Sequence, residues 1–134
     1  MRRRPISPGR FDALVDRALR SIPQRFRPYL RNVVVRSDAR PTGKLLRETG
    51  LGPGETLYGI YEGVPLTERT HEEPVLPDRI TVFREPLLRD FGGDEDETVR
   101  QIMLTVLHEV GHHFGLEEAV LDELEDDPAS PDVV

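Results

Sequence analysis

The sequence predicts a small α+β domain, in which several helices pack against a short β-sheet. Three observations support this prediction. The chain has 134 residues, which is the usual size of a single domain. Twelve Pro and eleven Gly residues divide it into short elements, which argues against a coiled coil or a simple helical bundle. Segments with helical periodicity and segments of alternating or β-branched residues follow one another along the chain.

The first half of the chain is predicted to supply one helix and two of three strands. A helix is expected over residues 8–22, where Ser7 is the N-cap, Pro8 takes the first helical position and Pro23 ends the helix. Strands are expected at residues 32–36, 57–61 and 79–84. Residues 37–56 are expected to be a loop with a single helical turn near Leu45 and Leu46, and residues 64–78 a polar loop.

The second half is predicted to be mainly helical. A short helix is expected over residues 86–91, followed by a break at Gly92 and Gly93. Asp94 stands three residues before Glu97, as in a capping box, so a long helix is expected over residues 95–114. A last helix is expected over residues 116–125. We therefore predict one domain over residues 1–125 and an acidic tail over residues 126–134.

Composition excludes several classes of protein. The chain has no cysteine, which excludes disulfide scaffolds, Cys-based zinc fingers and thiol enzymes. No apolar run approaches the ~20 residues of a membrane span, and no apolar segment follows the N-terminal arginines, so we expect a cytoplasmic protein without a signal peptide. The net charge is −7, which argues against nucleic acid as the main partner.

Charge is distributed unevenly along the chain. Residues 1–51 carry 13 basic and 4 acidic residues, whereas residues 52–134 carry 5 basic and 21 acidic residues. We interpret the basic first part as a solvated, arginine-rich surface.

The most informative motif is H-E-x-x-H at residues 108–112, on the predicted long helix. His108 and His112 are four residues apart, so both imidazoles lie on the same face and can bind one zinc ion. Glu109 projects beside that position and can take a proton from a water molecule that zinc activates. The apolar residues of this helix fall on the opposite side; they are Val99, Ile102, Met103, Val106, Val110 and Phe114.

The other two histidines have simpler interpretations. His113 lies at the edge of the apolar face, and we expect a packed structural residue. His71 lies in a polar stretch, and we expect a surface loop residue.

A third zinc ligand is expected shortly after the motif, because catalytic zinc usually has three protein ligands and one open position. Gly115 can end the helix with a positive φ and turn the chain back, so that Glu118 could reach the metal. Glu117 is the adjacent rival. Both could instead be surface acids, and the third ligand would then be sought among the acids of the next predicted helix, Asp122, Glu123 and Glu125.

The segment HEVGHHFGLEE at residues 108–118 resembles the zincin metallopeptidases, and is most similar to the aspzincin and metzincin pattern H-E-x-x-H-x-x-G-x-x-(D/H). The segments LYGIYEGVPLTER (57–69) and FREPLL (83–88) are similar to the minimal zincins, a family of small bacterial predicted metallopeptidases. The resemblance implies a zincin-like fold with a small mixed sheet of three or four strands, packed against an active-site helix and two or three other helices.

For the site, the resemblance implies one zinc ion per chain, bound by His108, His112 and Glu118, with Glu109 as the base. Glu118 stands where the larger families have Asp or His, and no Met-turn follows the motif.

Two functions remain open from the sequence. The first is a zinc-dependent peptidase acting on a peptide or protein, with Tyr58, Tyr61 and Arg69 as candidate oxyanion donors. In this function strand 79–84, if it lies at the sheet edge, could pair with an extended peptide. The second is a non-catalytic zinc-binding or partner-binding module on a reduced zincin scaffold. The short chain favours the module, whereas Glu109 argues against it, because a structural zinc site needs no base.

Overall fold

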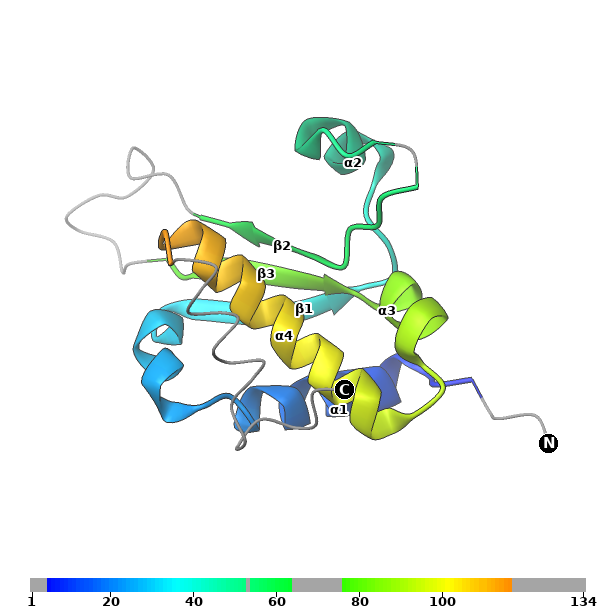
Figure 1. Cartoon of the computed structure of the whole chain (residues 1–134), viewed down its shortest axis with the longest axis horizontal. Helices are drawn as coiled ribbons and strands as arrows, with labels where there is room; N and C mark the ends of the chain where they lie inside the picture. The colour runs from blue at the N-terminus through cyan, green and yellow to red at the C-terminus, as the bar shows by residue number, and fades with distance from the viewer. Residues whose placement is uncertain (1–4, 53, 64–75, 117–134) are drawn as a thin grey trace.

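The computed structural model describes residues 5–52, 54–63 and 76–116. In this part of the chain, a three-stranded sheet lies against a layer of helices that includes the long helix α4 (Figure 1). The α+β architecture predicted from the sequence is confirmed. The elements in chain order are α1 (Pro8–Arg20), the 3₁₀ helix η1 (Gln24–Leu30), β1 (Val33–Asp38), α2 (Gly43–Thr49), β2 (Gly59–Glu62), β3 (Asp78–Phe83), α3 (Arg84–Phe91) and α4 (Glu95–His113).

The sheet is mixed, with the strand order β1-β3-β2. Strand β1 pairs with β3 in parallel, and β2 pairs with β3 antiparallel. The segment 79–84 therefore forms most of the central strand, and the condition under which it could pair with a peptide is not met. The edge strand that packs against α4 is β2.

The hydrophobic core lies between the sheet, α1 and α4. Helix α4 buries the predicted face, including Ile102, Val106 and Val110. Phe114 was predicted on that face but is 45% exposed, because α4 ends at His113 and Phe114 is its C-cap. The core cluster consists of Phe11, Leu14, Val15, Ala18, Ile22, Phe26, Ile80, Val82, Leu87, Val99, Ile102, Met103, Val106, Leu107 and Val110.

Both long helices begin as the sequence predicts. The Ser7 hydroxyl accepts the Arg10 N–H at 3.1 Å at the start of α1. The Asp94 carboxylate accepts the backbone N–H groups of Asp96, at 2.8 Å, and Glu97, at 3.4 Å. The Glu97 carboxylate points along the helix and accepts a bond from Gln101. The cap is thus confirmed, with Glu97 engaged further along α4.

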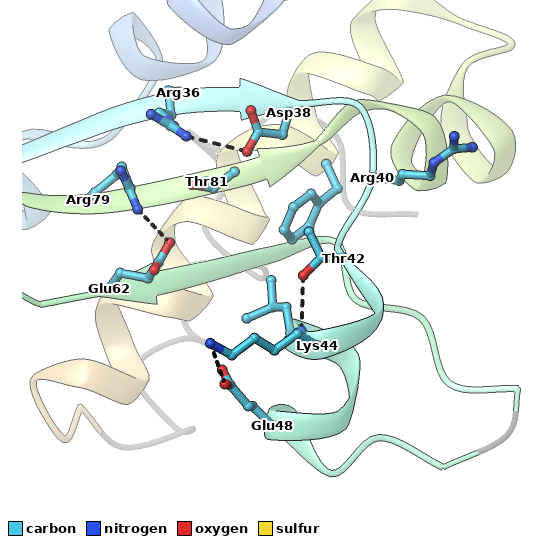
Figure 2. Close-up of a pocket in the computed structure, with 11 residues that line it drawn as sticks. Arg36, Asp38, Arg40, Thr42, Lys44, Glu48, Glu62, Arg79 and Thr81 are labelled. Carbon is cyan, nitrogen blue, oxygen red and sulfur yellow. Dashed lines mark hydrogen bonds and ion pairs between the residues drawn. The ribbon is translucent and has the colours of Figure 1, made fainter.

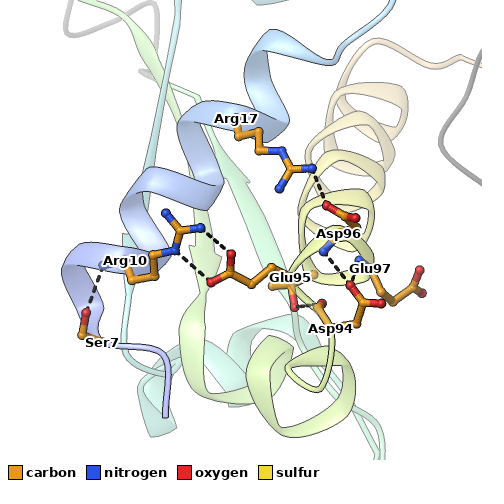
Figure 3. Close-up of polar contacts among 8 residues, drawn as sticks. Ser7, Arg10, Arg17, Asp94, Glu95, Asp96 and Glu97 are labelled. Carbon is orange, nitrogen blue, oxygen red and sulfur yellow. Dashed lines mark hydrogen bonds and ion pairs between the residues drawn. The ribbon is translucent and has the colours of Figure 1, made fainter. Parts of the chain in front are cut away.

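Two ion pairs connect α1 to the first turn of α4 (Figure 3). The Arg10 guanidinium binds the Glu95 carboxylate through two hydrogen bonds, one of them with an Nε–Oε2 distance of 2.8 Å. Two turns further along α1, the Arg17 guanidinium binds Asp96. Basic residues of the first part of the chain thus pair with acidic residues of the second part where α1 contacts α4.

The connections differ more from prediction than the long helices do. Residues 43–49 form the helix α2 rather than one turn, because the Thr42 hydroxyl caps its start and Gly50, with φ of 69°, ends it. The 3₁₀ helix η1, which contains Pro28, was not predicted. The predicted helix 116–125 and tail 126–134 lie almost entirely outside the described residues.

No helix in the described ranges combines the length and apolar character needed to cross a bilayer.

Candidate metal and catalytic site

The two motif histidines lie one turn apart on the exposed side of α4, opposite the core. Their rings are 4.4 Å apart between centroids, and the two Nε2 atoms are separated by 2.8 Å. Both side chains are therefore accessible, and their Nε2 nitrogens converge on one point, as the helical spacing predicted.

This arrangement fits a zinc ion. With Zn–N distances of about 2.0–2.1 Å, tetrahedral coordination separates two ligand nitrogens by about 3.3 Å. A small rotation of the imidazoles would open the observed 2.8 Å to that value. Neutral imidazole nitrogens are preferred zinc ligands. Within residues 5–52, 54–63 and 76–116 no group of three potential ligand side chains is brought together.

The third ligand remains a prediction, because Glu118 and its rival Glu117 lie outside the described residues. The turn that precedes them is described. Gly115 has φ of 68°, as predicted, and the Leu116 N–H donates to the Gly111 carbonyl at 2.8 Å. A second bond, from Gly115 N–H to the His112 carbonyl, completes a Schellman motif. Helix α4 therefore ends directly after the histidines.

Glu109 is half-buried between α4 and β2. Burial raises the pKa of its carboxyl above the usual range, because the charged form loses solvation. His112 and the backbone N–H of Tyr61, which donates to the carboxylate, act in the opposite direction on this pKa. Glu109 is thus a carboxylate with a fixed hydrogen-bond donor, next to the two imidazoles.

A cavity of about 340 Å³ lies beside Glu109 and His108, between the start of β2 and the middle of α4. Its walls mix apolar side chains, such as Leu57 and Leu104, with uncharged polar ones, such as Gln101 and Thr105. A substrate group of moderate size could therefore lie next to the reactive residues.

The candidate oxyanion donors have other partners. The Tyr58 hydroxyl donates to Asp90, and the Tyr61 hydroxyl donates to Asp78 at 2.6 Å. Each phenol proton is therefore engaged by a carboxylate, which disfavours the oxyanion role for both tyrosines. Arg69 and His71 lie outside the described residues.

His113 contacts Tyr61, Asp78 and Phe114. Its ring stacks on Tyr61 with 3.8 Å between centroids, and its Nε2 lies 3.9 Å from Asp78. The side chain is nevertheless 40% exposed, so the expected packed residue is a partly exposed one. Asp78 and the backbone of Tyr61 were not predicted as parts of this region. The signal that could have indicated them is the pair of glycines at 59 and 63, which flank Tyr61.

A second cavity, of about 260 Å³, lies between α2 and the opposite face of the sheet (Figure 2). Four of its charged side chains form two ion pairs. A guanidinium nitrogen of Arg36 lies 3.5 Å from a carboxylate oxygen of Asp38, and a guanidinium nitrogen of Arg79 lies 3.2 Å from a carboxylate oxygen of Glu62. Residues alternate between the two faces of a strand, so the sheet separates this cavity from the histidines.

A long helix that carries H-E-x-x-H and packs against a small mixed sheet defines the class of zincin-type metallopeptidase scaffolds. The family model for zincin-like metallopeptidases matches residues 30–127, and the chain belongs to this family. No curated protein gives a significant match. The matched range begins after α1, although α1 packs against α4 and contributes to its core. Membership of this family implies zinc binding.

Proposed function

We propose that this protein is a zinc-dependent peptidase. It binds one zinc ion per chain through His108, His112 and Glu118, and Glu109 is the general base. The observation that carries the proposal is the convergence of the two Nε2 atoms, 2.8 Å apart, beside the half-buried Glu109 carboxylate. A structural zinc site needs the imidazoles but not the carboxylate, so Glu109 favours hydrolysis over a purely structural role.

Zinc at this position supplies a Lewis acid that polarises a carbonyl and lowers the pKa of water. Glu109 accepts the proton of the attacking water and then donates it to the leaving amine. Because burial raises the pKa of Glu109, its carboxylate is a stronger base than an exposed one.

The position of β2 supports a peptide or protein substrate. This strand lies at the edge of the sheet and contacts α4. The backbone groups of an edge strand can pair with an extended peptide, although in β2 the Tyr61 N–H is already bound to Glu109 and takes no part in such pairing. The adjacent cavity of about 340 Å³ could then receive one substrate side chain.

Metal analysis of the purified protein tests the ligand set. We expect one zinc ion per chain in the wild type and the loss of most zinc in His108→Ala and His112→Ala. Glu118→Ala and Glu117→Ala form a matched pair, and only the Glu118 variant is expected to lose affinity strongly. Full zinc content in either histidine variant would refute the site. Loss of zinc in the Glu117 variant alone would shift the third ligand by one residue.

Cleavage of a peptide library, before and after chelation, tests the reaction. Glu109→Gln keeps the shape of the side chain but cannot accept a proton at neutral pH, so we expect retained zinc and no hydrolysis. Unchanged turnover in this variant would exclude Glu109 as the base. A zinc-loaded wild type that cleaves no peptide would favour the non-catalytic module.

A further inference from the structure

Strand β2 and the residue after it run beside α4 with matched spacing. A Cβ atom on Gly59 would lie 2.7 Å from Thr105 Cγ2, and one on Gly63 would lie 3.5 Å from His113 Cε1. Between these contacts, the Tyr61 N–H reaches Glu109. Two strand residues advance about 6.7 Å and four helix residues about 6 Å. Every second residue of the strand therefore meets every fourth residue of the helix: Gly59 meets Thr105, Tyr61 meets Glu109 and Gly63 meets His113.

The pairing of β2 with β3 determines where the Tyr61 N–H points. The Phe83 N–H donates to the Tyr58 carbonyl at 2.8 Å, so these two residues form a hydrogen-bonded pair. Hydrogen-bonded and non-hydrogen-bonded pairs alternate along an antiparallel ladder. Tyr61 pairs with Ile80, three residues further along, and is therefore in a non-hydrogen-bonded pair. Its N–H points away from β3, towards Glu109.

The side chain of Tyr61 fixes that backbone position from the other side. Its hydroxyl donates to Asp78 of β3, with 2.6 Å between oxygens. Its ring lies on the His113 ring, with 3.8 Å between centroids and an interplanar angle of 14°. Tyr61 is thus held by the central strand and by the end of α4 at the same time.

We propose that Tyr61 is a positioning residue, whose backbone N–H orients the Glu109 carboxylate and whose side chain is held in place by Asp78 and His113. The proposal rests on the proposed role of Glu109 as the base. A carboxylate can accept this N–H with one oxygen and still use its other oxygen for a water proton. The close approach at Gly59 allows the edge strand to come near enough to α4 for this bond.

Amide hydrogen exchange, measured by NMR on the metal-free protein, tests the contact without any activity. Glu109→Ala removes the acceptor, and a hydrogen bond to a charged group protects its donor by about tenfold or more. We therefore expect Tyr61 to exchange about tenfold faster in this variant. The Ile60 amide is the internal control, because its pair with Thr81 belongs to the hydrogen-bonded set. Equal rates for Tyr61 in wild type and variant would overturn the proposal.

A rescue experiment tests the spacing. Gly59→Ala places a methyl group against Thr105 Cγ2 and should also accelerate exchange at Tyr61. Thr105→Ser removes Cγ2 but keeps the hydroxyl that donates to the Gln101 carbonyl at 2.7 Å. The double variant is expected to recover most of the lost protection. No recovery would contradict a role for this close contact.

Two variants of Asp78 test whether the position of Tyr61 affects catalysis. Asp78→Asn keeps an oxygen that can accept the Tyr61 hydroxyl, whereas Asp78→Ala does not. We expect faster Tyr61 exchange and a several-fold lower kcat in Asp78→Ala, with unchanged zinc content and KM, and near wild-type behaviour in Asp78→Asn. A fall of kcat without a change in exchange, or equal effects in both variants, would refute the positioning role. If the wild type cleaves no peptide, the peptidase proposal fails, and the exchange data still decide whether Tyr61 positions Glu109.

Discussion

Replacing Thr98 with Val should destabilise the connection between α3 and α4, which we call the α3–α4 corner. The Thr98 side chain is fully buried, and its hydroxyl lies 2.7 Å from the Phe91 carbonyl and 2.8 Å from the Asp94 carbonyl. Phe91 is the last residue of α3, so the hydroxyl connects the two helices. Val has nearly the same shape but donates no hydrogen bond.

The expected loss follows from these contacts. Leaving a buried carbonyl without its donor costs about 1–3 kcal/mol, and burial of the extra apolar group offsets about 0.8 kcal/mol. The net loss in the free energy of unfolding should therefore lie between about 0.2 and 2.2 kcal/mol, with a central value of about 1.2 kcal/mol. With an m-value of about 2 kcal/mol/M, the central value lowers the urea midpoint by roughly 0.6 M. Zinc affinity should not change, because His108 lies ten residues, or about 15 Å, further along the helix.

Thr105→Val is the matched control for this measurement. Thr105 also donates to the carbonyl four residues earlier, but it is half-buried beside a cavity. We expect a cost below about 0.5 kcal/mol. Equal midpoints for the two variants would refute the argument that the Thr98 hydroxyl holds the corner.

Two further predictions concern the turn that ends α4 and the carboxyl group of Asp90. Gly115→Ala should lower the free energy of unfolding by about 1–2 kcal/mol, because φ of 68° is unfavourable for a side chain; Gly115→Asn should cost less, and equal urea midpoints would refute this reason. The hydrogen bonds from Arg89 and then Tyr58 lower the pKa of Asp90 to about 2. A lowered folded-state pKa contributes stability above the unfolded pKa of about 4, and this contribution is lost as the pH falls towards about 2. Tyr58→Phe should raise the Asp90 pKa in an NMR titration, and an unchanged titration would exclude the phenol as a cause.

The long helix and its reactive face could be predicted because they depend on local order. The periodicity of Val99 to Val110 determines which side of α4 is buried, and the four-residue spacing then places both histidines on the other side. The caps at Ser7 and Asp94 are also local. The prediction that Phe114 is buried was wrong for a local reason as well, because the periodic pattern continues past the residue where the helix ends.

The support of Glu109 could not be predicted because it depends on contacts between distant segments. Strand order decides that β2, and not β3, forms the edge beside α4. Only the register then shows that the Tyr61 N–H points outward and that its hydroxyl reaches Asp78. Helix α2 was underestimated because the Thr42 cap was not recognised.

The contact between α1 and α4 has a consequence for how the chain folds. Arg10 and Glu95 are 85 residues apart in the sequence, and the parallel pairing of β1 with β3 also joins distant segments. Domains of mixed α and β structure fold more slowly than helical bundles, because such non-local contacts have to close long loops. The helix that presents the histidines is therefore fully supported only late in folding. We expect zinc to bind the completed domain, so that it slows unfolding and leaves the refolding rate almost unchanged.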